Sequence, residues 1–311
     1  MELSVVIPVY NEAANVLVLY HRLQQAIQPL AISYELLFVN DGSADSSLDL
    51  IKQLAQQNTQ VRYLDFSRNF GQQIAISAGL DKAKGNAVVI LDGDLQDPPE
   101  LIPALYAQWQ KGHEVVYARR KTRAGESLTK KTTARLFYRL LTRITHTSMP
   151  VDAGDFRIIS RKVVNTLKQM PEQQKFIRGQ IAWLGFPQTF LEYDRLERYQ
   201  GQSGYSYTKM IRLALDGITS YSNLPLKMAT VSGFGVSGIA FLVMLYTLYS
   251  RFITRDYVPG WSSLMVSILF LGGVQLIAIG IIGEYMSRLS ENVRNRPLYI
   301  VNETNIPEEV N

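Results

Sequence analysis

Two carboxylates separated by one glycine follow an apolar run, and they are the residues best suited to chemistry. The run 87–91 is short, uninterrupted and rich in β-branched side chains, which predicts a buried parallel strand. Asp92 and Asp94 come directly after it. Ligands of open α/β sheets bind at the carboxyl ends of the strands, where paired carboxylates can hold a hard cation such as Mg²⁺ or Mn²⁺. The pair predicts a metal and diphosphate site, although Asp-Gly is also an ordinary turn signal.

A second acid occupies the equivalent place after another strand. The run 34–40 ends at Asn40 and is followed by Asp41, Gly42 and Ser43. If the sheet is parallel, the two Asp-Gly turns lie at one edge and their acids face one cleft. The coincidence favours a binding site over two unrelated loops.

The loop after the first strand is a third candidate. Residues 8–12 read Pro-Val-Tyr-Asn-Glu and lead from a strand into a helix. Asn11 is a candidate N-cap, and Glu12 favours the positive end of the helix dipole. A capped helix entry accounts for these two residues but gives no reason for Pro8 and Tyr10.

The elements that must position these loops alternate along the first half of the chain. Strands are expected at 3–9, 34–40, 61–66, 87–91 and 115–118, and helices at 12–27, 45–57 and 71–83. This order predicts an α/β fold with a mainly parallel sheet and right-handed crossovers.

Hydrophobicity is concentrated near the C-terminus. No charged residue lies between Lys227 and Arg251, or between Asp256 and Glu284. Each stretch exceeds the roughly 20 apolar residues that cross a bilayer as a helix. We expect two transmembrane helices, at 228–250 and 258–283, in preference to two buried helices of a soluble core.

The flanking charges suggest a topology. Residues 3–7 are already strand-like, with no cationic lead before them, so the first 220 or so residues are expected in the cytoplasm. Two spans return the C-terminus to the same side. Basic residues on the cytoplasmic side are Lys209, Arg212, Lys227, Arg288, Arg294 and Arg296, whereas the connecting loop has Arg251 and Arg255 beside Asp256. This asymmetry agrees with the positive-inside tendency.

The net charge of +5 favours anionic lipid headgroups over nucleic acid as a partner, because the chain has two candidate spans and no nucleic-acid module. A basic helix at 127–147 either lies on the membrane surface or packs with a solvated face. Residues 205–224 are expected to be interfacial. The absence of cysteine excludes disulfides and thiolate chemistry.

Several segments, in their order and spacing, carry a family resemblance. They are 6–12 (Val-Ile-Pro-Val-Tyr-Asn-Glu), 39–43 (Val-Asn-Asp-Gly-Ser), 67–71 (Ser-Arg-Asn-Phe-Gly) and 91–98 (Leu-Asp-Gly-Asp-Leu-Gln-Asp-Pro). Together they resemble the inverting family 2 glycosyltransferases with a Rossmann-like GT-A fold. Residues 152–157 (Asp-Ala-Gly-Asp-Phe-Arg) and the two-span C-terminal hairpin are similar to the polyprenyl-phosphate branch, which includes dolichyl-phosphate mannose synthases and bacterial undecaprenyl-phosphate glucosyltransferases.

On the donor side, the resemblance assigns roles to single residues. Pro8, Tyr10 and Glu12 match the loop that holds the nucleoside, and Asp41 matches an acid that accepts a hydrogen bond from the base. Asp92 and Asp94 match the metal–diphosphate pair, with Gln96 close by.

On the acceptor side, Asp155, Phe156 and Arg157 match a motif that faces the acceptor phosphate and the sugar. A segment that binds phosphate near the membrane is matched by Arg198, Gln202, Ser203 and Tyr205. Relatives often have a lysine after that serine, where this chain has Gly204. A phosphate contact is then either missing or supplied by Arg195, Arg198 or Lys209.

The resemblance implies transfer of a hexose, with glucose from UDP-glucose preferred, to polyprenyl phosphate with inversion. Asp94 holds the Mg²⁺ or Mn²⁺ directly or through water, and Arg157 or a nearby arginine steadies the incoming phosphate. The acceptor is mostly a dianion at neutral pH because its second pKa is near 6. We therefore expect Asp155 to orient the acceptor or the sugar more than to remove a proton.

The expected organisation is a catalytic GT-A domain at 1–204, juxtamembrane interfacial helices at 205–227, two transmembrane helices at 228–283 and a cytoplasmic tail at 284–311. The protein is expected in the inner membrane as a multi-pass protein, with the catalytic domain and both termini cytoplasmic.

Other interpretations stay open. One is a mannose synthase that uses GDP-mannose. Another is a processive polysaccharide synthase, which typically has more spans and a Gln-x-x-Arg-Trp motif that this chain lacks; Trp183 is expected in the core instead. A third is a nucleotide-sugar sensor with a degenerate site, which the intact acids disfavour. The oligomeric state is open, with a homo-oligomer as one alternative.

Overall fold

The structure is a computed structural model that describes residues 1–120, 153–194, 224–249, 253 and 260–307. The chain divides into two compact units. The sheet unit comprises Met1–Tyr205 and Arg296–Asn311, and the helical unit comprises Ser206–Asn295. The basic segment 127–147 and the four acceptor residues Arg198, Gln202, Ser203 and Tyr205 lie outside the described residues.

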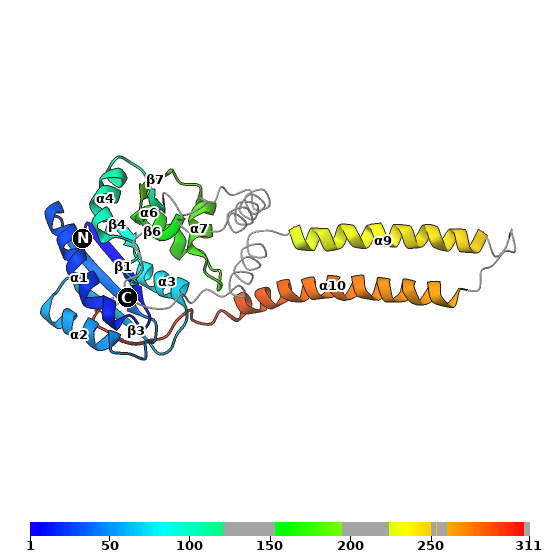
Figure 1. The fold of residues 1–311 in the computed structure, drawn as a ribbon, viewed down its shortest axis with the longest axis horizontal. Helices are drawn as coiled ribbons and strands as arrows, with labels where there is room; N and C mark the ends of the chain where they lie inside the picture. Colours follow the sequence, from blue (N-terminus) through cyan, green and yellow to red (C-terminus); the bar gives the residue numbers. More distant parts are fainter. Residues whose placement is uncertain (121–152, 195–223, 250–252, 254–259, 308–311) are drawn as a thin grey trace. The chain divides into compact units, whose positions relative to one another are not determined.

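The sheet unit, drawn as a ribbon in Figure 1, is built on one eight-stranded sheet. The strand order is β7-β5-β6-β4-β1-β2-β3-β8. Its centre consists of β1 (Leu3–Val9), β2 (Tyr34–Asn40), β3 (Val61–Phe66) and β4 (Ala87–Ile90), which run parallel. After β1 the chain moves outward to β2 and β3 and then returns to place β4 on the other side of β1. This reversal is the point at which open α/β sheets form a ligand crevice.

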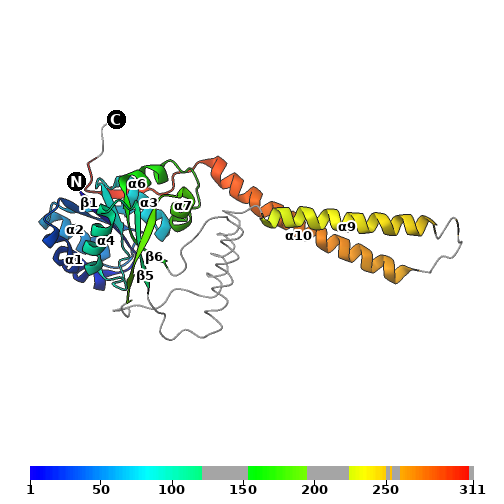
Figure 2. The same ribbon diagram turned by 90° about the horizontal axis from the view of Figure 1, so that it is seen from above.

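Helices cover both faces of the sheet (Figure 2). One face carries α1 (Ala13–Ile27), α2 (Ser47–Gln57) and α4 (Ile102–Gln110). The short helix η1 (Gln28–Leu30) directly follows α1, and η2 (Pro99–Leu101) directly precedes α4. The other face carries α3 (Gln72–Lys82), α6 (Arg161–Lys168) and α7 (Ile177–Leu184). Because both faces are covered, β1 and β2 are buried along their full length, which explains why most of their residues are apolar.

Antiparallel strands make the sheet mixed. β6 (Ala153–Ser160) lies between β4 and β5 (Val115–Arg120) and is antiparallel to both. β7 (Gln188–Tyr193) is parallel to β5. The expected α/β fold with a mainly parallel sheet is confirmed, but the insertion of β6 was not predicted, because a local sequence pattern does not specify which strand is its neighbour.

The first helix entry differs from the expectation. Asn11 is not the N-cap of α1: Glu12 occupies that position, without a side-chain capping bond. Asn11 instead has a positive φ of 55°, and its side-chain oxygen accepts a hydrogen bond from the backbone N–H of Ala44 at 2.8 Å. The residue therefore joins the loop after β1 to the loop after β2.

A strand formed by the last residues completes the sheet. Residues 301–304, which were expected to belong to a cytoplasmic tail, form β8 (Val301–Thr304), antiparallel to β3. Glu303 contacts Lys52 at 2.5 Å and accepts a hydrogen bond from the Tyr63 hydroxyl at 2.8 Å. The ring of Tyr299 stacks on Phe66 with 5.1 Å between centroids. The C-terminal segment is thus part of the sheet unit.

The expectation for Trp183 was wrong. This side chain lies on α7 and is 62% exposed, so it is not a core residue. The buried positions of α7 are Ile177, Gly179, Gln180 and Ile181, which leaves Trp183 on the outward side.

The helical unit contains α9 (Leu224–Tyr249) and α10 (Trp261–Arg294), which contact each other. Among the described residues, one helix segment, Phe270–Arg294, is long and apolar enough to cross a membrane, and a shorter apolar helix segment covers Met228–Val243. α10 continues past Gly283, the expected end of the second span, to Arg294.

Candidate active site

Asp92 and Asp94 lie at the carboxyl end of β4, beside the end of β1. The N–H of Leu91 donates to the carbonyl of Val6 at 3.0 Å, so the chain is still attached to β1 when it enters the Asp-Gly-Asp turn. A Cβ on Gly93 would lie 3.1 Å from the carbonyl oxygen of Pro8. Glycine therefore allows the turn to approach the loop after β1 closely, and the two acids adjoin the predicted donor loop.

Asp155 reaches the same edge from β6. The antiparallel register pairs Ile90 with Arg157, and extending it by two residues puts Asp155 opposite Asp92. Alternation along the strand puts Asp155 and Arg157 on one side of β6 and Phe156 on the other. Phe156 is fully buried and meets Tyr193 edge to face, so it packs in the core and does not face an acceptor.

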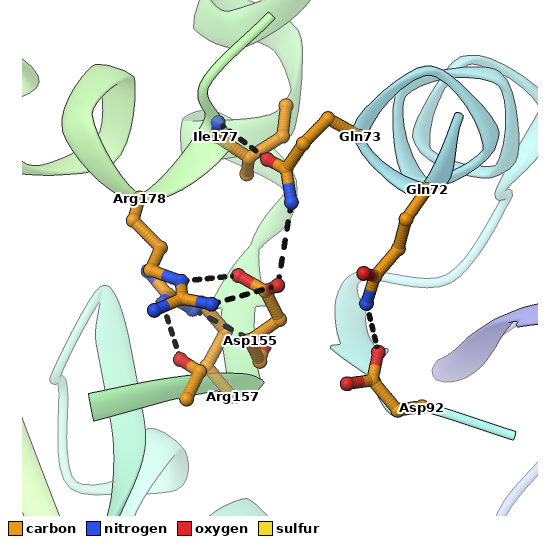
Figure 3. Close-up of polar contacts among 8 residues, drawn as sticks. Gln72, Gln73, Asp92, Asp155, Arg157, Ile177 and Arg178 are labelled. Atoms are coloured by element: carbon orange, nitrogen blue, oxygen red, sulfur yellow. Dashed lines mark hydrogen bonds and ion pairs between the residues drawn. The ribbon is translucent and has the colours of Figure 1, made fainter. Parts of the chain in front are cut away.

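The Asp155 carboxylate is held from two helices (Figure 3). Arg178 on α7 donates from Nε to Oδ1 at 2.6 Å and from Nη2 to Oδ2 at 3.1 Å. Gln73 on α3 donates from Nε2 to Oδ2 at 3.3 Å. The neighbouring Gln72 donates to Oδ1 of Asp92 at 2.7 Å. Two adjacent glutamines of one helix thus each hold one of the two acids.

The surroundings of Asp92 and Asp155 shift the pKa values of these two acids in opposite directions. Burial, followed by the negative charges of Asp155, Asp97 and Asp94, raises the pKa of Asp92 to about 8. Burial alone would also raise the pKa of Asp155, but the positive charge and hydrogen bonds of Arg178 outweigh it and hold that pKa below its usual range. Asp155 is therefore ionised at neutral pH and is a weak base.

Arg157 is 4% exposed, and its guanidinium donates hydrogen bonds to backbone carbonyls of its own strand, β6. Nη2 donates to the carbonyl of Gly154 at 2.7 Å, and Nε donates to the carbonyl of Asp155 at 3.3 Å. Burial lowers its pKa to about 10. The partly exposed guanidinium beside Asp155 belongs to Arg178, whose side chain is 36% exposed.

Asp41 is buried and fixes the start of α3. Its two oxygens accept hydrogen bonds from the backbone N–H groups of Phe70, at 2.7 Å, and Gly71, at 2.9 Å. Burial raises its pKa in spite of these bonds. Gly42 beside it has φ +66°, and a Cβ there would lie 2.5 Å from the Arg68 backbone, so the loop requires glycine. The role of Asp41 toward a base stays a prediction.

The remaining predicted donor residues surround this edge. Pro8 is buried within β1, and Tyr10 is 50% exposed. Glu12 accepts a hydrogen bond from Asn15 Nδ2 at 2.5 Å, and its own N–H donates to Ser47 Oγ at 2.9 Å. The N–H of Gln96 donates to Oδ1 of Asp94 at 3.2 Å, which places Gln96 next to the acid pair as expected.

The acid pair fits a divalent cation by the chemistry of its donors. Carboxylate oxygens suit Mg²⁺ and Mn²⁺, and Asp92, whose pKa is raised by burial and then by the charges of Asp155, Asp97 and Asp94, lies among other acids. Within the described ranges, no group of three or more His, Cys, Asp or Glu side chains is arranged to hold a metal ion. Mg²⁺ is commonly bound by one or two carboxylates together with substrate phosphates, so two acids are a sufficient protein contribution.

The residues that the sequence did not reveal are Gln72, Gln73 and Arg178. The two glutamines directly follow the Ser-Arg-Asn-Phe-Gly segment. Their position next to this motif could have indicated that they belong to the site. Arg178 lies in a stretch without any recognisable motif, and only the packing of α7 places it at the site.

Comparison with known proteins defines the family. Residues 4–168 match the Glycosyl transferase family 2 domain. The chain is 48% identical over 303 residues to the uncharacterized glycosyltransferase sll0501 of Synechocystis, covering 97% of this chain and 95% of the relative. It is 42% identical over 301 residues to the bactoprenol glucosyl transferase of Shigella phage SfII, covering 97% of each. The chain belongs to glycosyl transferase family 2.

A similarity to a solved structure was also found. It is glucosyl-3-phosphoglycerate synthase from Mycobacterium tuberculosis in complex with Mn²⁺, UDP and glucosyl-3-phosphoglycerate. The TM-score is 0.49 at 19% sequence identity, over 70% of this chain and 77% of that one.

Proposed function

We propose that this protein transfers glucose from UDP-glucose to polyprenyl phosphate, with inversion at the anomeric carbon. The observation that carries the proposal is the meeting of Asp92, Asp94 and Asp155 at the sheet edge of a family 2 chain. Its support from relatives is the bactoprenol glucosyl transferase that matches 97% of the chain at 42% identity. Bactoprenol is a polyprenyl alcohol, and a polyprenyl phosphate acceptor agrees with that name.

The donor occupies the crevice between the ends of β1 and β4 in a GT-A arrangement. Tyr10, Pro8 and Glu12 line the nucleoside side, with Asp41 beneath them, and Asp92 and Gln96 adjoin the diphosphate. Support for this placement comes from the closeness of Gly93 to Pro8, which brings the donor loop and the acid pair together.

Asp92 and Asp94 would hold Mg²⁺ or Mn²⁺, which when bound offsets negative charge on the leaving diphosphate. Without it, the two acids and a diphosphate would repel one another. The negative charges of Asp155, Asp97 and Asp94 near Asp92, which add to burial in raising its pKa, support this proposal.

Asp155 orients the acceptor or the sugar hydroxyls. Its pKa lies below the usual range, so it remains an anion that accepts hydrogen bonds and removes protons poorly. The acceptor phosphate ionises by itself near pH 6 and needs no base at neutral pH. Arg157 steadies this arrangement by fixing the backbone carbonyls of Gly154 and Asp155.

The helical unit anchors the enzyme in the inner membrane as a two-span hairpin of α9 and α10, with the sheet unit and both termini in the cytoplasm. Support comes from the apolar segments Phe270–Arg294 and Met228–Val243 and from the basic residues on either side of the hairpin. Basic residues outside the described ranges, with Arg198, Gln202, Ser203 and Tyr205, bind the acceptor phosphate and anionic headgroups.

The test is transfer of radiolabelled sugar into organic-extractable lipid by the purified protein. Polyprenyl phosphate and a divalent cation are supplied with UDP-glucose, UDP-galactose, UDP-N-acetylglucosamine or GDP-mannose in parallel. We expect product with UDP-glucose and at least tenfold less with the other donors. Product from GDP-mannose alone would replace the proposed donor, and no product from any donor would refute the transferase function.

A further inference from the structure

Gln73 connects three elements of the site through one side-chain amide. It lies on the first turn of α3. Its Oε1 accepts a hydrogen bond from the backbone N–H of Ile177 at 3.0 Å, and its Nε2 donates to Oδ2 of Asp155 at 3.3 Å (Figure 3). These partners are 104 and 82 positions away along the chain.

The two hydrogen bonds of the Gln73 amide hold both Asp155 and α7, the helix that carries Arg178. We call this pair of hydrogen bonds the bridge. Asp155 is 5% exposed and forms its ion pair with Arg178, the second residue of α7. Arg178 alone would let the carboxylate follow any movement of α7. Gln73 adds a contact to Asp155 from another helix and fixes the first residue of α7, Ile177, so the acid and its partner are held together.

The turn that carries Gln73 is itself fixed. Asp41, at the end of β2, accepts hydrogen bonds from the N–H groups of Phe70 and Gly71, directly before α3. Gly71 is the N-cap of α3 and has φ 104°, a conformation that favours glycine. The position of Gln73 is therefore set by the central parallel strands. Through its hydrogen bond to Asp155, Gln73 in turn restrains the position of that side chain on β6.

We infer that Gln73 is a positioning residue that sets the direction in which the Asp155 carboxylate faces the acceptor. The inference rests on the proposed transfer reaction. Gln73 acts through Asp155. An amide is required because one group must accept from a backbone N–H and donate to a carboxylate. Each half of this function can be removed separately: a glutamate keeps the acceptor half, and a lysine keeps the donor half.

The experiment compares Gln73→Glu with Gln73→Lys in steady-state transfer assays of the full-length protein at pH 8. Gln73→Glu keeps an acceptor for Ile177 but repels Asp155, whereas Gln73→Lys donates to Asp155 but loses Ile177. We expect kcat of Gln73→Glu to fall about 10- to 100-fold, the scale of a small misplacement at a reacting centre. KM for UDP-glucose should change less than about twofold, and Gln73→Lys should keep at least about threefold more kcat than Gln73→Glu.

Gln53 on α2 provides the matched controls, since it is exposed and on the opposite face of the sheet. Gln53→Glu and Gln53→Lys should match the wild type. The inference is overturned if Gln73→Glu retains wild-type kcat, or if Gln73→Lys is the more impaired variant, because the amide would then serve only to dock α7.

Failure of the proposed function gives a different pattern, in which the wild type itself makes no lipid-linked sugar. The bridge is then judged from thermal unfolding at pH 8. Gln73→Glu should unfold at a lower temperature than Gln73→Lys, because it places a second anion beside Asp155, and the Gln53 pair should show no such order. Equal unfolding temperatures of the two Gln73 variants would overturn the inference in that case.

Discussion

Asp155 and Arg178 form an ion pair with two contacts, 2.6 Å from Nε to Oδ1 and 3.1 Å from Nη2 to Oδ2. The acid is 5% exposed, and the arginine side chain is 36% exposed. A paired geometry of this kind fixes both the position and the plane of the carboxylate. It also determines the charge of the acid, since Arg178 is what keeps the pKa of Asp155 low.

Replacing Arg178 with methionine should therefore destabilise the protein. The substitution leaves a buried carboxylate without its ion-pair partner, which costs about 3–5 kcal/mol at neutral pH. Asp155 has a lower pKa in the folded than in the unfolded protein, where the value is about 3.9. Its stabilising contribution is thus present above that pH and is lost as pH falls through the folded value. The difference in unfolding free energy between wild type and Arg178→Met should narrow as the pH falls from the pKa of Asp155 in the folded variant, which lacks Arg178, to its lower pKa in the folded wild type.

A surface pair of similar geometry provides the control. Arg22 donates to both carboxylate oxygens of Glu100, at 2.8 and 2.7 Å, but the Glu100 side chain is 54% exposed. Exposed ion pairs contribute about 0.2–1 kcal/mol, so Arg22→Met should cost less than Arg178→Met. Equal losses in thermal unfolding of the two variants would show that burial of Asp155 has no energetic consequence.

The pH dependence of kcat distinguishes an orienting role of Asp155 from a role as the base. We expect Asp155→Asn to lower kcat at every pH from 6 to 9, because the variant lacks an anion that orients the substrate. The wild-type rate should fall on the acid side near the second phosphate pKa, about 6. Recovery of Asp155→Asn at high pH, where the acceptor is fully ionised, would instead identify Asp155 as a base.

Cation binding should depend on pH through Asp92. Its pKa of about 8 means that, without a cation, the carboxyl is mostly protonated at pH 7. A cation must displace that proton, so the apparent affinity for Mn²⁺ should rise as pH increases from 6.5 to 8.5. Calorimetric titration of Mn²⁺ into the protein in the presence of UDP would measure this affinity at each pH. Removal of the cation with EDTA should abolish transfer. Asp92→Asn should bind Mn²⁺ more weakly and with a flatter pH dependence; an unchanged pH dependence would show that another group titrates.

Sequence patterns predicted the parts of the fold that depend on local chemistry. β1, β2 and β3 occupy the expected residues, because each is a short stretch in which apolar residues outnumber polar ones. The positions of Asp92 and Asp41 after their strands followed from the same logic. The antiparallel β6 could not be predicted, since its place between β4 and β5 depends on contacts between distant segments.

The same reason explains what was missed at the site. Gln73 contacts Ile177 across 104 positions, and no periodic pattern records such a pair. Arg157 was expected at the acceptor phosphate because the family resemblance matched residues 155–157 to a motif that faces the acceptor. In the structure its guanidinium donates to two backbone carbonyls. A motif therefore identifies the neighbourhood of a site, while packing decides which guanidinium is accessible.

The C-terminal segment should be required for stability of the sheet unit. Tyr299 stacks on Phe66 and donates a hydrogen bond from its hydroxyl to Asp81 at 3.4 Å, and Asn302 Nδ2 donates to Asp65 at 2.8 Å. Tyr299→Ala should lower the unfolding free energy by about 1–2 kcal/mol, since the ring is only partly buried. Deleting residues 296–311 should have a larger effect, because it also exposes the edge of β3.

This contribution of β8 changes how the proposed membrane anchor must be tested. A truncation of residues 225–311 removes β8 together with α9 and α10. A loss of activity in that variant could then come from lost membrane anchoring or from a destabilised sheet. Replacing 225–295 by a flexible linker retains β8, and that variant should keep UDP-glucose binding while losing transfer to long-chain lipid. The truncation of 225–311 should lose both. If the two variants bind UDP-glucose equally well in calorimetry, β8 does not stabilise the donor site, and the contacts of Glu303 and Tyr299 have no effect beyond the sheet edge.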